Sequence, residues 1–344
     1  MRERRGFLVL TVLAATTASA ADIRVPQDYA TIQAAIDAAP ADARIVVSRG
    51  TYYENLVIGK SLTLVSRSGA GATTLDGGRA GPVILASGTG AESVEISGFT
   101  IVNGLNVLTT NVASPGAGGG IHAESLAHAT ISDNVVRDNV GCLGAGISTL
   151  DVSVDIENNQ IFANQQDASC SDGDGGGILV RGGGSAPSLI ASNQIAGHRI
   201  GGSGAGVKIQ GADAVIRDNV IRDNVAKAGG AIAFDVSSGI VSNNMLVGNS
   251  ADVGGGMLLT PTDNGNRLVV AGNMLIGNRA SLGGSAIDVA VTDDSLRLRG
   301  NAIDGDTPVE LIRCETAFSV SRSNILNNSS GPAIGGACTL GLIF

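Results

Sequence analysis

The residue types best suited to chemistry in this sequence gather between positions 122 and 235. Four of them are candidate catalytic residues, Asp172, Asp174, Arg181 and Lys208. Four more are candidate ligand-binding residues, His122, Glu124, Gln210 and Asp235. A pair of carboxyl groups can protonate a leaving oxygen or bind Ca²⁺, and an Arg or Lys can abstract a proton beside a uronate carboxylate or stabilise the charge that develops there. These residues suggest acid–base chemistry, with calcium as the one cofactor that they could use.

A repeated pattern from position 96 to 328 must position these groups. Each copy has an apolar residue, a polar residue three later, a second apolar residue two after that and another polar residue three further on. The first polar position is Asn in seven of nine copies, namely Asn134, Asn159, Asn193, Asn219, Asn244, Asn273 and Asn301. Phe99 and Ser323 take that place in the first and last copies, and Ile325 is the last apolar anchor. Copies lie 22 to 35 residues apart, which is typical of the coils of a solenoid.

Each coil is predicted to contain three short strands. The anchors are Ile, Val or Leu, and the apolar segments are only three to five residues long. Gly and Asn are too frequent for helices, and both tolerate the left-handed backbone of tight bends. Equivalent strands of successive coils would pair ~4.8 Å apart, so the anchors would stack inside and the Asn side chains would form ladders at the bends.

A Gly-rich turn precedes one strand of each coil, for example at 144–147 and 229–232. Alternation along that strand predicts two rows of outward side chains. The first row is His122, Ser148, Leu179, Lys208, Ala233, Leu258 and Asp288, and the second is Glu124, Leu150, Arg181, Gln210, Asp235, Thr260 and Ala290. The long insertions 105–117 and 165–174 enter the same strand, so we expect them to rim this face.

The same rows also have a purely structural interpretation. Polar side chains on an outward face are what solubility requires, and Leu150, Leu179 and Leu258 interrupt the rows. The segment SDGDGGG at 171–177 could bind calcium, but a polar turn is the simpler interpretation. The sequence assigns no ligands to a metal ion.

The region 92–334, with these repeats, resembles the right-handed parallel β-helix of the pectin-lyase-like superfamily. Its GGGI and GGAI units are also similar to those of polymorphic outer-membrane proteins and related bacterial surface β-helices, and the segment 25–66 is similar to the opening of pectinesterase-like proteins. The resemblance implies an all-β fold, a single-stranded right-handed parallel β-helix of about eleven coils with a short N-terminal capping helix. It also implies that the face entered from long loops is a substrate site.

The motifs of individual enzyme families are nevertheless absent. The segments that carry the catalytic Asp and Arg of pectinesterases do not occur, and neither do those of pectate lyases. Gly197 and His198 resemble part of a polygalacturonase motif, but His198 stands where other copies have Asn, so we interpret it as a structural substitute. We therefore expect a non-catalytic surface protein that binds a polysaccharide or another envelope protein. The alternative is a polysaccharide-active enzyme, a pectate or uronate lyase or a glycoside hydrolase.

The N-terminus has the pattern of a signal peptide. Arg2, Arg4 and Arg5 precede an apolar stretch, and Ala-Ser-Ala at 18–20 predicts cleavage before Ala21. No later apolar run approaches ~20 residues, so we expect no transmembrane segment after cleavage. The formal net charge of −9 argues against a nucleic-acid partner. The predicted location is the periplasm, the extracellular space or the outer surface.

One helix is predicted within 28–40, with Ile32, Ala35 and Ile36 on one face and Pro40 at its end. It would cap the first coil, where unpaired strand edges would otherwise be exposed. The predicted organisation is a signal peptide at 1–20, the capping helix and first coils at 21–66, and the β-helix with a closing segment at 67–344.

Four cysteines in an exported chain predict two disulfides. Cys142 and Cys170 lie in turns of adjacent coils, and Cys314 and Cys338 flank the last full repeat. We therefore expect the pairs 142–170 and 314–338. The cysteine spacing does not fit a zinc site.

Overall fold

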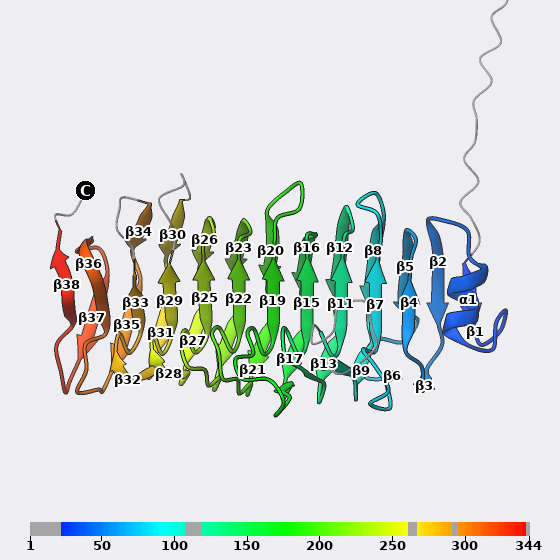
Figure 1. Cartoon of the computed structure of the whole chain (residues 1–344), viewed down its shortest axis with the longest axis horizontal. Coiled ribbons are helices and arrows are strands. Elements are labelled where there is room, and N and C mark those ends of the chain that lie inside the picture. The colour runs from blue at the N-terminus through cyan, green and yellow to red at the C-terminus, as the bar shows by residue number, and fades with distance from the viewer. Residues whose placement is uncertain (1–21, 107–117, 261–266, 291–294, 342–344) are drawn as a thin grey trace, which may run out of the picture.

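The chain winds into a stack of about eleven coils in a computed structural model that describes residues 22–106, 118–260, 267–290 and 295–341. Figure 1 shows the coils side by side along one long axis, with corresponding strands aligned. Three sheets of eleven strands run along that axis, and neighbouring strands pair in parallel. The predicted all-β parallel β-helix is confirmed.

The strands are short, and we group them by sheet in chain order. Sheet A contains β1 (Ile23–Val25), β2 (Ala43–Val47), β5 (Leu62–Ser66), β8 (Ser93–Ser97), β12 (His128–Ser132), β16 (Ser153–Glu157), β20 (Ser188–Ala191), β23 (Ala214–Arg217), β26 (Gly239–Ser242), β30 (Leu268–Ala271) and β34 (Leu296–Arg299). Sheet B contains β3 (Gly50–Tyr52), β6 (Thr73–Asp76), β9 (Thr100–Val102), β13 (Val135–Arg137), β17 (Gln160–Phe162), β21 (Gln194–Ala196), β24 (Val220–Arg222), β27 (Met245–Val247), β31 (Met274–Ile276), β35 (Ala302–Gly305) and β37 (Ile325–Asn328). Sheet C contains β4 (Leu56–Ile58), β7 (Ile84–Ser87), β11 (Ile121–Glu124), β15 (Ile147–Leu150), β19 (Ile178–Arg181), β22 (Val207–Gln210), β25 (Ile232–Asp235), β29 (Met257–Thr260), β33 (Ile287–Val289), β36 (Ile312–Val320) and β38 (Ile334–Leu340).

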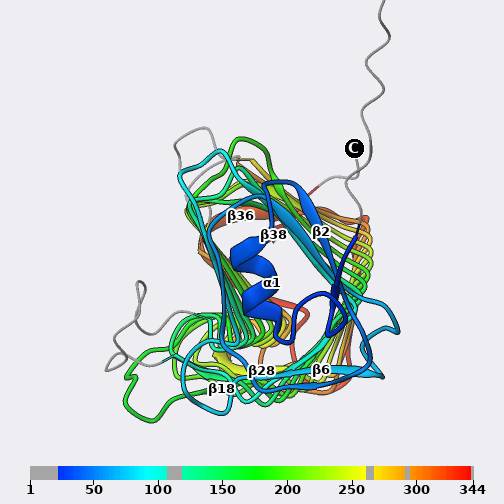
Figure 2. The same cartoon turned by 90° about the vertical axis from the view of Figure 1, so that its right-hand side faces the viewer.

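A side lobe, which the sequence pattern did not predict, projects at the corner between sheets B and C (Figure 2). It is built from β10 (Leu105–Asn106), β14 (Val140–Gly141), β18 (Gln165–Gln166), β28 (Ser250–Val253) and β32 (Arg279–Gly283). Single bridges, such as Ser203 with Ala228, continue the pairing between these two groups of strands. The lobe therefore runs along the middle coils of the solenoid, beside the start of the sheet C strands from β11 to β33.

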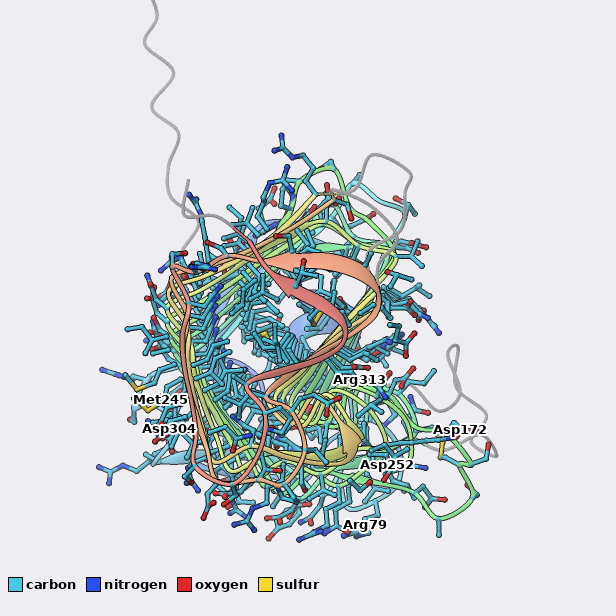
Figure 3. All side chains as sticks on the ribbon, turned by 90° about the vertical axis from the view of Figure 1, so that its left-hand side faces the viewer. Arg79, Asp172, Met245, Asp252, Asp304 and Arg313 are labelled. Carbon is cyan, nitrogen blue, oxygen red and sulfur yellow. A yellow bond between two sulfur atoms is a disulfide. The ribbon has the colours of Figure 1, made fainter. Side chains whose placement is uncertain are left out.

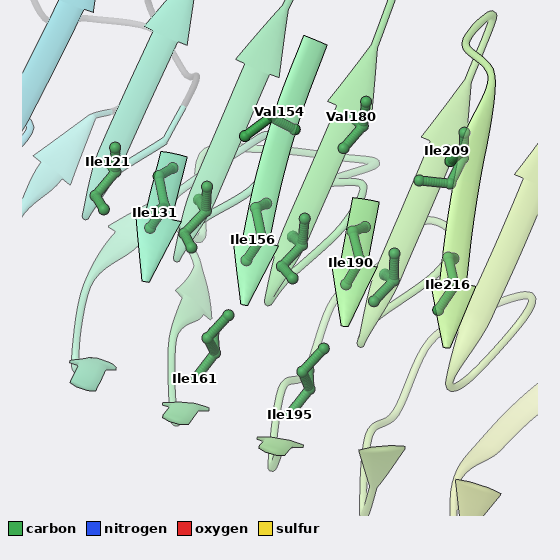
Figure 4. Packing of buried hydrophobic residues seen from close by; sticks show 14 of the residues in the cluster. Ile121, Ile131, Val154, Ile156, Ile161, Val180, Ile190, Ile195, Ile209 and Ile216 are labelled. Atoms are coloured by element: carbon green, nitrogen blue, oxygen red, sulfur yellow. The ribbon is translucent and has the colours of Figure 1, made fainter. Parts of the chain in front are cut away.

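The core consists of apolar ladders, one residue from each coil. Ile121, Ile147 and Ile178 stack at one position of sheet C, and Ile131 and Ile156 stack opposite them in sheet A. Figure 4 shows Ile121, Ile131 and Ile156 pointing into the space between the sheets. All are fully buried, so the sheets are held by repeated aliphatic contacts.

Asparagine ladders form at the bends, as predicted. In the bend between sheets A and B, each amide nitrogen donates to the amide oxygen of the next coil, for example Asn193 Nδ2 to Asn219 Oδ1 at 3.0 Å. The same Nδ2 atoms also donate to main-chain carbonyls, as Asn219 does to Ile190 at 2.8 Å. Burial of these amides is therefore compensated coil by coil.

The last copy of the repeat departs from the predicted frame by one residue. Ile325 pairs with Ala302, so Leu326 rather than Ile325 lies in the row of the inward Ile303. Ile325 is consequently 70% exposed, and Asn324 rather than Ser323 accepts the ladder bond from Asn301 Nδ2 at 2.9 Å. A one-residue shift in a strand moves each side chain to the opposite face, which explains the error at both positions.

The predicted capping helix is α1 (Ile32–Ala38), which lies across the open first coil in Figure 2. Thr31 caps it by accepting from Ala34 N at 3.2 Å, and Ile32, Ala35 and Ile36 are buried against the first strands. The helix ends before Ala39, whose extended backbone precedes Pro40, because a residue before proline disfavours helical torsions. The helix thus covers the edges that the first coil would expose.

Both predicted disulfides are confirmed. Cys142 pairs with Cys170 at a Cα separation of 5.7 Å, and Cys314 pairs with Cys338 at 5.0 Å. The first joins two turns of the lobe, and the second joins β36 to β38 in the last coils. Each therefore ties one coil to the next.

Candidate functional site

The two predicted outward rows of sheet C are present and in register. Strand pairing aligns Lys208 with Leu179 and Ala233 in the first row, and Gln210 with Arg181 and Asp235 in the second. The rows thus bring most of the predicted site residues onto one face, next to the lobe.

The first row, although it points away from the core, is not exposed. His122 and Lys208 are only 1% and 4% exposed, and Ser148, Leu179, Ala233 and Asp288 are buried as well. The Gly-rich turns lie over this row: a Cβ added to Gly204 would stand 3.0 Å from Cβ of Lys208, and one added to Gly175 would stand 2.9 Å from Cβ of Leu179. The solubility explanation is therefore wrong for the first row.

Lys208 lies at the centre of a polar network that links the lobe to the second row. Its Nζ donates to Ser203 Oγ at 2.9 Å and contacts Asp235 Oδ2 at 3.4 Å. Ser203 in turn donates to Asp174 Oδ1 from both its hydroxyl, at 2.9 Å, and its main-chain nitrogen, at 2.7 Å. A buried ammonium needs such partners, because an unpaired charge in this position would be strongly destabilising.

Asp235 also meets two neutral groups of its own row. Gln210 Nε2 lies 3.4 Å from Asp235 Oδ2, and Thr260 Oγ1 lies 3.3 Å from Oδ1. Its side chain remains 33% exposed, so a ligand can still reach the carboxylate. With Arg181 aligned beside Gln210, the second row presents polar groups on four successive coils.

The two aspartates predicted from the 165–174 insertion have different surroundings. Asp174 faces Ser203, as described, and its main-chain oxygen accepts from Gly144 N at 2.8 Å. Asp172 is exposed and points away from the solenoid on the outer side of the lobe (Figure 3). The structure therefore joins Asp174, Lys208, Gln210 and Asp235, and leaves Asp172 apart from them. Most of the other insertion, 107–117, lies outside the described residues, so the predicted convergence of the two loops is not described.

His122 and Glu124 form a second pair on the same face, three coils before Lys208. His122 Nε2 lies 3.1 Å from Glu124 Oε2. Burial lowers the pKa of His122, and the positive charge of Arg181 acts in the same direction, whereas Glu124 acts against them. At a coil spacing of ~4.8 Å this pair lies roughly 14 Å from Lys208, too far for one acid–base step to use both.

A shallow pocket of about 300 Å³ continues from the second row. It is lined by residues 183–187 and 211–213 and by Val236, which follow Arg181, Gln210 and Asp235 closely in the chain. Backbone groups and small side chains line it, so it could accept the polar end of an extended ligand.

Sequence reasoning missed Ser203, which connects Asp174 to Lys208. Ser203 precedes the Gly-rich turn 204–207 in a segment without a distinctive motif, and only the stacking of successive coils, in which Gly175 N donates to the Ser203 carbonyl at 3.1 Å, brings it to Asp174. A buried ion pair at the other end of the first row was also missed. Arg313 Nε and Nη2 donate to Asp288 at 2.6 and 2.9 Å, which is the strong two-point geometry of Arg and carboxylate.

Among the described residues, no three His, Cys, Asp or Glu side chains come together as a metal site would require. The segment 171–177 instead contributes a turn whose Asp174 side chain is engaged by Ser203. In the same parts of the chain, no helix has the length and apolar character needed to span a bilayer.

Comparison with known proteins gives a family and a fold. A family model described as "Right handed beta helix region" matches residues 83–340. No curated protein sequence matches this chain.

Two solved structures superpose on most of the chain. DFA-IIIase from Arthrobacter chlorophenolicus A6 without its lid has a TM-score of 0.59 at 16% identity, with 92% of each chain covered. A point mutant of that DFA-IIIase in complex with DFA-III has a TM-score of 0.53 at 16% identity, covering 92% of this chain and 86% of the other. At this identity the likeness is one of fold.

Proposed function

The chain belongs to the right-handed β-helix family, and sheet C presents rows of side chains in register, so we propose that sheet C binds a polysaccharide and that the protein cleaves it. The proposal reverses the expectation of a non-catalytic surface protein. A solenoid of this kind can carry an enzyme, since DFA-IIIase has a similar fold. The residues of this chain, and not that likeness, carry the reaction proposed here.

The observation that carries the proposal is the position of two carboxylates around Lys208. Asp174 reaches Lys208 through Ser203, and Asp235 contacts Lys208 directly. The three contacts in series hold the two carboxylates at most about 9 Å apart, a limit that is compatible with the separation of about 6.5 to 9.5 Å used for glycoside hydrolysis by inversion. A buried lysine between two carboxylates is more than solubility requires.

We assign roles to these groups from their surroundings. Asp235, which keeps a third of its side chain exposed, accepts a proton from the attacking water. The water oxygen then bonds to the anomeric carbon as the glycosidic bond on the opposite face breaks. Asp174, in its protonated form, donates its proton to the leaving oxygen, and Lys208 stabilises the partial negative charge on that oxygen. Arg181, Gln210 and Thr260 hold the sugar units on successive coils by hydrogen bonds.

A second candidate function is polysaccharide binding without cleavage. It is supported by the second row itself, in which Arg181, Gln210, Asp235 and Thr260 follow one another on adjacent coils. Such a row can hold an extended chain whether or not the carboxylates react. In that case the network around Lys208 would serve only to orient the row.

Incubation of the protein with neutral and uronate polysaccharides, with and without Ca²⁺, separates the two functions. New reducing ends without absorbance of unsaturated products would indicate hydrolysis, and new reducing ends together with that absorbance would indicate elimination. We expect reducing ends that are lost in Asp235→Asn and in Asp174→Asn. The matched control is Asp304→Asn, an exposed carboxylate on sheet B. Binding with no product from any substrate would favour the second candidate.

We also propose that the protein is exported, with residues 1–20 as its signal peptide and 21–66 and 67–344 as the parts of the mature chain. Two disulfides between successive coils suit an oxidising compartment. N-terminal sequencing of the protein from culture fractions should begin at Ala21. A first residue of Met1 in the cytoplasmic fraction would contradict the proposal.

A further inference from the structure

We propose that the outer face of sheet B is the surface through which two copies of this chain form a dimer. The inference rests on a different face from the proposed function and is independent of it. Sheet B has three-residue strands whose first and third side chains point outward. On two neighbouring strands of sheet B these outward side chains are apolar and at least partly exposed.

This region, the methionine patch, consists of Met245 and Val247 on β27 and Met274 and Ile276 on β31. Met245 and Met274 are 40% and 43% exposed although they carry no charge. Figure 3 shows Met245 directed away from the core on the outer side of the coil. Val220 lies one coil before Met245 in the same row, and Ala302 and Ile325 follow Met274. Earlier coils have Gln160 and Gln194 there, so the apolar character belongs to the later coils and not to the whole sheet.

Charges of opposite sign flank the patch at equal distances. Arg222 lies one coil before it and Asp304 one coil after it, in the same outward row as Val247 and Ile276. Both are exposed, and Figure 3 shows Asp304 on the same side as Met245. Over four successive coils this row therefore contains a positive residue, two apolar residues and a negative residue, namely Arg222, Val247, Ile276 and Asp304.

A surface with this order of residues is complementary to the same surface of a second copy that runs in the opposite direction. A two-fold axis parallel to the strands, placed between β27 and β31, would lay the two sheets face to face with their coil order reversed. Met245 would then meet Met274 of the second copy, and Val247 would meet its Ile276. Arg222 of each copy would meet Asp304 of the other, at both ends of the patch.

The present partners of these charges do not prevent the exchange. Arg222 Nη1 contacts Asp223 at 2.7 Å, but both side chains are more than half exposed, and such pairs contribute little to stability. Asp304 accepts from Asn327 Nδ2 at 2.7 Å through one oxygen, which leaves the other for an arginine. Sheets that pack face to face lie ~10 Å apart, which an arginine can span.

Sedimentation velocity of the full chain from roughly 1 to 500 µM tests the proposal, because a patch of this size predicts a weak, reversible dimer. Arg222→Asp alone and Asp304→Arg alone would place like charges opposite each other and should raise the Kd about tenfold or more. The double variant should restore wild-type dimerisation. Arg137→Asp, in the same row of sheet B but three coils earlier, is the matched control and should dimerise as the wild type does.

Circular dichroism of each variant separates loss of the dimer from loss of the fold. A wild type that stays monomeric at 500 µM would overturn the proposal. So would a dimer that neither single charge reversal weakens, or a double variant that fails to recover while folded.

Discussion

The asparagine ladder and the first outward row of sheet C both bury polar side chains, but they do so in different ways. In the ladder, Asn193, Asn219 and Asn244 have the same partners in every coil. In the outward row, His122, Lys208 and Asp288 each have a different set of partners, drawn from a different element. Repetition of one residue with one set of bonds is what stability of a coil requires. Irregular burial of charge is where we look for function.

The ladder should therefore show the largest loss of stability. In Asn219→Leu, the main-chain nitrogen of Asn193 would lose the oxygen that it donates to, and the carbonyl oxygen of Ile190 would lose the bond from Asn219 Nδ2, while both groups remain buried. We expect a loss of about 4 kcal/mol, since each unsatisfied group costs about 1 to 3 kcal/mol. Thermal unfolding followed by circular dichroism measures it. Asn327→Leu, an exposed position, is the control, and equal melting temperatures of the two variants would contradict the role of the ladder.

The two disulfides should separate stability from activity. Loss of either one is expected to destabilise by about 3 kcal/mol, because each closes a similar length of chain, 28 and 24 residues. Only Cys142→Ser with Cys170→Ser loosens the turns beside Asp174, so only this pair should also lower turnover below the melting temperature. Cys314→Ser with Cys338→Ser is the control. Equal turnover in both double variants would mean that the turns of the lobe do not influence the activity of the site.

His198, which occupies a position of the asparagine ladder and lies outside the candidate site, should make the stability of the fold depend on pH. Burial lowers its pKa to about 4, although two main-chain carbonyls lie 3.2 Å from its ring nitrogens. The unfolded chain binds a proton near the ordinary pKa of 6.5 and the folded chain does not, so stability falls as pH falls from 6.5 to 4, by about 3 kcal/mol in all.

His198→Asn should remove that dependence and leave stability at pH 7 nearly unchanged. Denaturant unfolding at pH 7, 5.5 and 4 measures it. His128→Asn, at a partly exposed position of sheet A, is the control and should keep the fall in stability. An unchanged slope in His198→Asn would mean that His198 does not titrate as described.

Lys208 should show the smallest effect on stability and the largest contrast with function. In Lys208→Met the side chain keeps its apolar contacts and Asp235 remains partly solvated, so we expect a change of about 1 kcal/mol or less. Turnover should fall by about 100-fold or more, because the positive charge between the carboxylates is removed. Lys227→Met, an exposed lysine of the lobe, is the control. Full turnover in Lys208→Met would mean that Lys208 has only a structural role, as the asparagine ladder has.

Much of this structure was readable from the repeat. Strict spacing of Ile and Asn predicts the stacking of strands, because each coil must place the same side chain in the same environment as the coil before it. The prediction of both disulfides and of His198 as a substitute for Asn followed from the same frame. It failed at Ile325 and Asn324, where the last copy has no following coil to confirm its register.

The sequence by itself determined the coil, the two outward rows and the bends, since these depend on local periodicity that each repeat states again. Only the tertiary structure decided that the first row is buried, that Ser203 joins Asp174 to Lys208 and that Asp172 lies apart. These contacts depend on the lobe, whose strands are two to five residues long and leave no periodic signal. Contacts between non-repeating residues of different coils leave no signal in the periodic pattern of the sequence. Such contacts are therefore known only from the folded structure.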